Sequence, residues 1–333
     1  MLQSKPDTGP RKLRDTAVTQ GECAKRIIVV LGMHRSGTSV TMNLLNAFGV
    51  PLSDDLMDPT EHNARGYFES TTIFRLHDEI FEAMGTTWMT SSLVIPLAKN
   101  RWRTARVQTL KAELSGIVQR ELEKHDGLWG FKDPRTARLL PLWLELIEEL
   151  GLDPRFVLAT RNPSDVAKSL FSRDGIDPID AEILWLEHNA DVVLNLRGRL
   201  DAIVDYSVWM NDPVEQARYM LERLHLDWEG TAEDIKRITS DVIAADLRHH
   251  DSAVSSFKLP FTAPFYRALL NRDLTKLYSL SEAFNAARGF AEAVLAPSRR
   301  ELQRQIIDQL SPVIQARGER IVDLEAQLAK RNG

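Results

Sequence analysis

Short runs of apolar residues, separated by longer amphipathic stretches, organise much of this chain. Residues 27–31 read Ile-Ile-Val-Val-Leu and end at Gly32, which is typical of a strand buried on both faces of a parallel sheet. Further short runs predict strands at residues 129–131, 156–160 and 202–206. Each run is too short for a helix of ordinary length, so a strand is the better interpretation.

Apolar positions recur at helical spacing between these runs. They predict helices at residues 38–48, 71–84, 104–124, 139–150, 180–200 and 213–224. Strands that alternate with helices predict an α/β fold, with a central parallel sheet between two layers of helices. Ligands in such sheets bind at the carboxyl ends of the strands, so we look for chemistry where each strand ends. The segment 51–69, rich in Pro, Asp, Asn and Gly, is predicted to be a long functional loop.

The end of the chain has a different pattern. From Ser298 onward, leucines and isoleucines fall at three-, four- and seven-residue steps among charged residues. This predicts a long amphipathic helix over 298–333, either a coiled-coil segment that joins copies or recruits a partner, or a helix packed on its own domain. We expect a flexible arm over 1–25 and the main domain over 26–297.

Composition excludes several classes of protein. The chain has 333 residues, 43% of them hydrophobic, and can bury a sizeable core. Its net charge of −5 gives no overall basic signature, so no nucleic-acid partner is expected. Cys23 is the only cysteine, which excludes an internal disulfide framework and fits a cytoplasmic protein. No apolar stretch is long enough to predict a transmembrane helix, and the polar residues 1–25 predict no secretory signal.

The most informative motif follows the first predicted strand. Gly32 and Gly37 are separated by four residues and followed by Thr38 and Ser39, which is phosphate-loop spacing. Thr38 stands where a loop that binds a nucleoside triphosphate has a lysine for the β- and γ-phosphates. The fold is therefore expected to be similar to that of P-loop NTPases, with a loop for a different phosphate-like anion. Arg35 offers a replacement cation.

The residue types of the loop suit an oxyanion. Glycines let backbone N–H groups approach it closely, and the start of the following helix adds unpaired amides. Ser36, Thr38 and Ser39 add hydroxyl donors. His34 either contacts the ligand or has a structural partner, and the sequence leaves both interpretations open.

A second motif makes the resemblance specific. Arg161 follows the strand predicted at 156–160, and Ser169 lies eight residues later. Together with the glycine loop, this pair resembles the motifs of sulfotransferases that use 3′-phosphoadenosine 5′-phosphosulfate (PAPS). The resemblance covers roughly residues 26–250. The segments Lys132–Arg135 and Arg65–Glu69 resemble those of bacterial sulfotransferases of carbohydrate type.

The resemblance implies roles for these residues. The glycine loop would bind the 5′-phosphosulfate of PAPS, and Arg161 with Ser169 would bind the 3′-phosphate. The product nucleotide would be 3′,5′-adenosine diphosphate (PAP). The acceptor would be a hydroxyl, or an amine, of a carbohydrate or glycolipid, with tyrosine or a small metabolite left open. The glycine-rich C-terminal segment of cytosolic sulfotransferases is missing, and Arg248 is either a substitute contact or part of a solvated turn.

Transfer needs a base for the acceptor proton and a cation for the leaving oxygen. Glu69 is the favoured base, and His62 is its competitor because its ordinary pKa is nearer neutral. Arg35 and Lys132 are the favoured cations, although Lys132 has the alternative of a structural pair with Asp133 or Glu69. The scattered histidines and single cysteine predict no metal site.

Two rival functions stay open at this point. The first is a P-loop nucleotide kinase or NTPase, in which the pair Arg161 and Ser169 has no role. The second is a non-catalytic nucleotide-binding scaffold that acts through its C-terminal helix.

Overall fold

The computed structural model describes residues 25–61, 63, 66–91, 101–243, 257–291 and 293–294. The chain divides into two compact units, Met1–Phe284 and Asn285–Gly333. In the second unit the described residues are helical. The predicted arm before residue 25 and the predicted helix over 298–333 lie outside the described residues, so both stay predictions.

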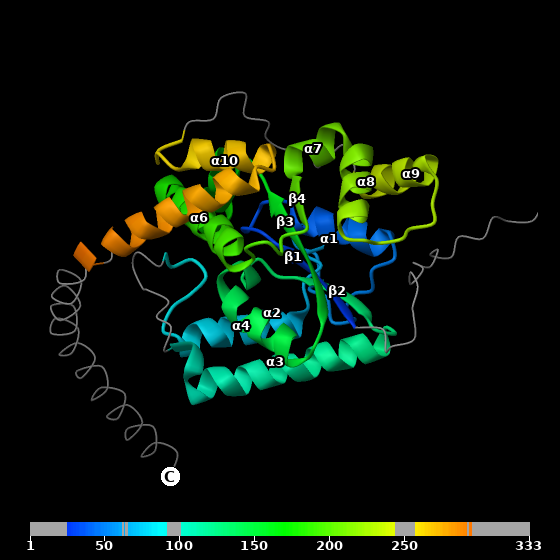
Figure 1. The fold of residues 1–333 in the computed structure, drawn as a ribbon, viewed down its shortest axis with the longest axis horizontal. Coiled ribbons are helices and arrows are strands. Elements are labelled where there is room, and N and C mark those ends of the chain that lie inside the picture. The colour runs from blue at the N-terminus through cyan, green and yellow to red at the C-terminus, as the bar shows by residue number, and fades with distance from the viewer. Residues whose placement is uncertain are drawn as a thin grey trace, which may run out of the picture. The chain divides into compact units, whose positions relative to one another are not determined.

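A four-stranded parallel sheet lies at the centre of the first unit (Figure 1), in the order β2-β1-β3-β4. The strands are β1 (Arg26–Leu31), β2 (Leu128–Lys132), β3 (Asp153–Thr160) and β4 (Ala202–Asp205). Successive side chains of β1 point to opposite faces, so Val29 enters one core cluster and Val30 the other. Both faces of the sheet are therefore buried, as the apolar run predicts.

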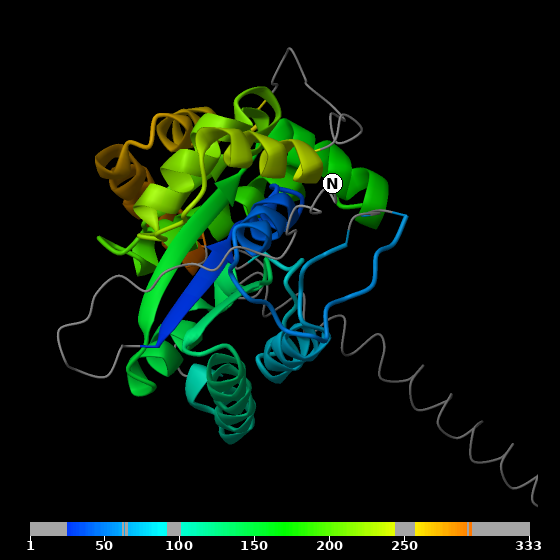
Figure 2. The same cartoon turned by 90° about the vertical axis from the view of Figure 1, so that its right-hand side faces the viewer.

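Helices cover both faces of the sheet (Figure 2), which confirms the predicted three-layer α/β/α fold. One face packs against α2 (Thr71–Ala83), α3 (Ala105–Lys124), α4 (Thr136–Glu149), α5 (Pro163–Asp174), α6 (Pro178–Asn195) and α10 (Thr262–Leu270). The other packs against α1 (Thr38–Ala47), α7 (Tyr206–Asn211), α8 (Pro213–Arg223) and α9 (Ala232–Val242). A 3-10 turn, η1 (Arg101–Arg103), precedes α3. No described helix is both long and apolar enough to cross a membrane.

The register brings the strand ends to one edge of the sheet. Val30 lies opposite Lys132, and Thr160 lies opposite Asp205. The chain passes from β1 to β2 on one side and later returns to β3 on the other side of β1. The loop after β1 therefore lies where the strand order reverses, the usual place for a ligand in this kind of sheet.

A buried polar network fixes α2 to the end of β2. His77 lies 2.9 Å from an oxygen of Asp133, and the Trp143 indole donates to its other nitrogen at 2.9 Å. Because an indole only donates, His77 carries its proton on Nδ1 and donates it to Asp133. Burial opposes the charge of Asp133, but the Arg135 guanidinium and the hydrogen bonds from His77 and Arg135 outweigh it and hold the pKa of the Asp133 carboxyl well below its ordinary value. The network fixes the residue next to Lys132.

The Asp133 network generates a stability prediction. Asp133→Asn should lower the free energy of unfolding at pH 7 by about 1–3 kcal/mol, because the buried Arg135 guanidinium loses one carboxylate partner and keeps its pair with Asp78. Urea denaturation measures this. Since the folded pKa is depressed, the stabilisation is present above the ordinary pKa of 3.8 and is lost as pH falls below it, so the two proteins should converge in acid.

Asp54→Asn is the matched control, because the Asp54 carboxylate pairs with Lys124 at the surface. It should leave unfolding nearly unchanged. Equal stability of wild type and Asp133→Asn would show that the network does not hold the sheet edge.

Candidate functional site

The loop between β1 and α1 has a backbone that only certain residues tolerate. Gly32 has a φ of 143°, Arg35 of 66° and Gly37 of 87°. A Cβ atom on Gly32 would lie 2.3 Å from the carbonyl oxygen of Ala159, and one on Gly37 would lie 2.9 Å from the Tyr206 ring. The two glycines thus let the loop approach β3 and the start of α7 closely.

The loop has unused hydrogen-bonding groups. Gly37 is the N-cap of α1, and no side chain caps this helix. The hydroxyls of Ser36 and Thr160 are buried and have no hydrogen-bond partner among the described residues. Buried polar groups are normally satisfied, so unpartnered hydroxyls beside an uncapped helix start fit a bound oxyanion.

Lys132, the last residue of β2, reaches the start of α1. Its ammonium donates to the Glu69 carboxylate, to the Ser39 hydroxyl at 3.1 Å and to the Thr38 hydroxyl at 3.4 Å. The side chains of Lys132 and Glu69 are only 2% and 6% exposed. The structure therefore brings together two predicted catalytic residues and two predicted loop residues. It also realises the alternative of a Lys132–Glu69 pair, whereas Asp133 bonds to His77 and Arg135.

The loop 51–70 holds Glu69 in place. The Glu69 carbonyl oxygen accepts from the Met57 amide at 2.8 Å, and the Ser39 hydroxyl donates to the Tyr67 carbonyl oxygen at 3.2 Å. Phe68, just before Glu69, has a φ of 56°, a left-handed backbone conformation that costs a non-glycine residue conformational free energy. Burial raises the pKa of Glu69 above its ordinary 4.5, and Asp133 raises it further, although Lys132 opposes both.

The second predicted motif meets the first. The guanidinium Nε of Arg35 donates to the Ser169 hydroxyl at 2.8 Å, and Arg161 donates to the carbonyl oxygen of Arg35 at 3.5 Å. The Arg161 guanidinium also lies 4.4 Å from the centre of the Tyr206 ring. Burial and the neighbouring charges of Arg173 and Arg161 lower the pKa of Arg35. Close, partly buried guanidinium groups favour a bound anion.

His34 lies against a tryptophan. Its ring stacks on Trp88 with 3.8 Å between centroids, and its Nε2 is buried without a partner among the described residues. Burial lowers the pKa of His34 well below its ordinary value, and the charges of Arg135 and Arg173 lower it further. The sequence left open whether His34 contacts a ligand or a structural partner, and the structure supplies Trp88 as the structural partner.

Sequence reasoning missed Arg173, whose charge acts on both His34 and Arg35. Arg173 sits one helical turn after Ser169, so the periodicity of the predicted helix was the available signal. His62, Arg65 and Arg248 lie outside the described residues, and their predicted roles stay predictions. In the described part of the chain, no cluster of three or more His, Cys, Asp or Glu side chains is placed to hold a metal.

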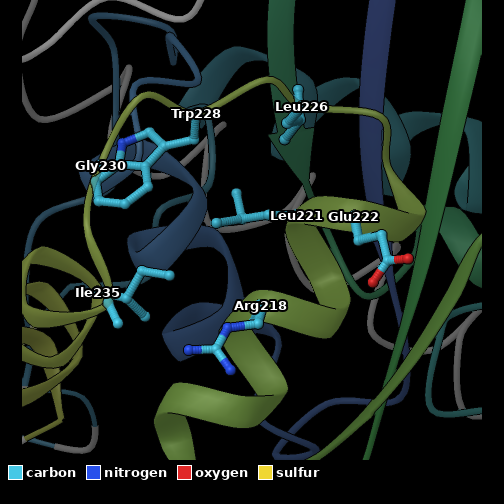
Figure 3. Close-up of a pocket in the computed structure, with 8 residues that line it drawn as sticks. Arg218, Leu221, Glu222, Leu226, Trp228, Gly230 and Ile235 are labelled. Atoms are coloured by element: carbon cyan, nitrogen blue, oxygen red, sulfur yellow. The ribbon is translucent and has the colours of Figure 1, made fainter.

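A pocket of about 300 Å³ lies elsewhere (Figure 3). The turn after α8 contributes Leu226 and Trp228, and α8 and α9 complete the lining. The backbone carbonyl oxygen of His225, next to Leu226 of the lining, accepts a hydrogen bond from the Arg26 side chain. Arg26 is the first residue of β1, so the pocket lies toward the amino ends of the strands. It is separate from the site described above.

The close approach of Gly32 generates a testable prediction. Gly32→Ala should lower the free energy of unfolding by at least about 2 kcal/mol, because the methyl group meets the Ala159 carbonyl and the φ is strained. Gly198→Ala is the matched control: its φ is also positive, at 75°, but nothing lies within 4 Å of its added Cβ. It should cost only about 1 kcal/mol. Equal losses in thermal unfolding would refute the close approach.

No family model matches this chain, and no curated protein matches it. Among solved structures, it is similar to the sulfotransferase domain of the Synechococcus PCC 7002 olefin synthase, at 19% identity and a TM-score of 0.42, over 82% of this chain and 98% of that one. It is also similar to a sulfotransferase domain of the curacin biosynthetic pathway, at 17% identity and a TM-score of 0.39, over 64% of this chain and 77% of that one. At such similarity, function has to be argued from the chain's own residues.

Proposed function

We propose that this protein is a sulfotransferase that moves a sulfuryl group from PAPS to a hydroxyl group of an acceptor. One observation carries the proposal: the glycine loop after β1 is joined to the Arg161–Ser169 motif through Arg35. A nucleotide with phosphates at two positions needs two such cationic sites within its own length. The Lys132–Glu69 pair at the start of α1 adds a cation and a base beside the loop.

A nucleoside triphosphate suits these residues less well. Its terminal phosphates need a loop lysine, and this loop has Thr38 at that position. Lys132 reaches the loop from β2, but the buried Glu69 carboxylate already partly neutralises its charge. A triphosphate also gives Arg161 and Ser169 no phosphate to bind.

The residues of the site fit PAPS. The uncapped start of α1, with the unpartnered hydroxyl of Ser36, would hold the 5′-phosphosulfate. Arg161 and Ser169 would hold the 3′-phosphate, with Arg35 between the two groups. When bound, the donor supplies an activated sulfuryl group joined to a phosphate oxygen that can leave.

Glu69 and Lys132 act together in the proposed transfer. As the acceptor oxygen attacks sulfur, Glu69 takes the proton of the hydroxyl, and the bond from sulfur to the nucleotide phosphate breaks. A protonated Glu69 attracts Lys132 less strongly. The ammonium is then released to stabilise the negative charge on the leaving oxygen, with the loop amides assisting. Proton transfer to Glu69 thus makes the positive charge of Lys132 available as negative charge develops on the leaving oxygen.

The finer parts of the proposal rest on the sequence. The segments Lys132–Arg135 and Arg65–Glu69 favour a carbohydrate or glycolipid acceptor. The heptad pattern over 298–333 favours assembly into homo-oligomers or with a partner. The single cysteine favours the cytoplasm.

Nucleotide binding tests the donor. Calorimetric titration of the full chain should show that PAP binds at least about tenfold more tightly than ADP, because ADP has no 3′-phosphate for Arg161. Arg161→Ala should remove this preference. Arg120→Ala on the exposed side of α3 is the control and should retain it. Stronger binding of ATP than of PAP would instead support the kinase or NTPase alternative.

The role of Glu69 is tested by turnover, measured as PAP release from PAPS with ethylene glycol as a simple hydroxyl probe. Glu69→Gln should keep PAP affinity and lower turnover by about 10²–10⁴-fold. Glu82→Gln on the exposed face of α2 is the control. In the wild type, turnover should fall as pH is lowered through the raised pKa of Glu69, on a limb above 4.5, because a base must be ionised. Full turnover in Glu69→Gln would leave His62 as the predicted base.

A further inference from the structure

The helix α6 buries an imidazole that forms one hydrogen bond and has a second nitrogen without a partner in the described part of the chain. His188 is fully buried, and its Nδ1 lies 2.7 Å from the Leu184 carbonyl oxygen one turn earlier. A carbonyl oxygen only accepts, so Nδ1 carries the proton and Nε2 presents a lone pair. Nε2 has no partner among the described residues. A buried acceptor without a donor costs about 1–3 kcal/mol, so a donor is expected there when the protein works.

Among the side chains that the structure describes, none donates to His188 Nε2. Arg138, a buried residue of α4, pairs with Glu187 at 2.8 Å and with Asp191 at 2.9 Å. Protonation of His188 Nε2 would also remove the unsatisfied lone pair, but it does not occur near pH 7. Burial lowers the pKa of His188 to about 3, and the Arg138 charge lowers it further, so the ring stays neutral near pH 7.

The His188 ring lies beside a residue of the glycine loop. The ring of His34 lies edge-on to that of His188, with 6.4 Å between centroids, and its own Nε2 is buried and unpartnered too. Stacking on Trp88 holds the His34 ring in position. The charge of Arg135 acts on His34, on His188 and on Glu69, so all three lie around the end of β2. Two imidazoles, each with a nitrogen that has no partner among the described residues, therefore lie together beside the glycine loop.

We propose that His188 and His34 form the seat for the acceptor, and that His188 Nε2 accepts a hydrogen bond from an uncharged hydroxyl-bearing group. This inference rests on the proposed sulfuryl transfer and specifies its acceptor as a hydroxyl donor. A carboxylate or a phosphate ester without a free hydroxyl has no proton to donate to the lone pair of His188 Nε2. His188 binds and orients the acceptor, while Glu69 remains the group that takes the proton.

The test uses full-length protein, PAPS as donor and ethylene glycol as the hydroxyl probe. Glycol should accelerate PAP release with saturation, whereas 1,2-dimethoxyethane, which has the same oxygens but no hydroxyl, should not. His188→Leu should raise the half-saturating glycol concentration about tenfold, the loss of one hydrogen bond. His188→Gln places an amide oxygen near the position of Nε2 and should recover most of the loss.

The measurements distinguish a failure of the acceptor seat from a failure of the proposed sulfotransferase function. PAP affinity should be the same in wild type, His188→Leu and His188→Gln, and that measurement also reports folding. If wild-type protein does not bind PAP, the proposed sulfotransferase fails. If PAP binds but His188→Leu responds to glycol as the wild type does, or if the ether acts like glycol, the seat is refuted and a buried water satisfies His188. A His188→Gln variant as impaired as His188→Leu would also refute it.

Discussion

The buried ion pair between Lys132 and Glu69 is the interaction on which this site depends. It joins the end of β2 to the loop 51–70, and through Ser39 and Thr38 it joins both to the start of α1. Taking two charges out of water is expensive, and a buried pair is weak evidence for stability. Apolar residues of similar size would hold these segments at less cost. The proposed transfer would give the pair a different role, in which Glu69 acts as a base, Lys132 acts as a cation, and the two separate when the reaction places charge nearby.

The rest of the edge is arranged around that pair by the parallel sheet. Each strand delivers one part: β1 the glycine loop, β2 Lys132, β3 Arg161 and β4 the start of α7 with Tyr206. Lys132 lies on one side of the loop and Arg161 on the other, because β1 sits between β2 and β3. In the proposed reaction, the strand order would therefore place the transfer on one side of the loop and the nucleotide on the other. A donor lying across the loop would have its reacting end near Glu69.

Local patterns predicted much of this, because strands, glycine loops and helix periods are encoded within a few residues. The strands, the loop and the position of Arg161 were all available from the sequence. Tyr206 was assigned to a strand but begins α7, where Asp205 caps the helix by accepting from the Ser207 amide at 2.8 Å. Contacts across long separations were not available. The bonds of His77 to Asp133 and Trp143 span 56 and 66 residues, and no spacing rule relates them.

His188 shows why the remaining part of the site escaped the sequence. A histidine in an apolar helical pattern is normally a satisfied core residue, and half of His188 is satisfied by its own helix. What distinguishes it is a buried nitrogen that has no donor among the residues that the structure describes, and only the fold can show that. The same holds for His34, whose position in the loop suggested a ligand but whose stacking on Trp88 appears only in three dimensions. Burial and the surrounding guanidinium groups keep both imidazoles uncharged near pH 7. Because His188 uses its Nδ1–H on Leu184, its Nε2 can only accept a hydrogen bond, and an attacking hydroxyl is a donor that the proposed transferase would have to orient.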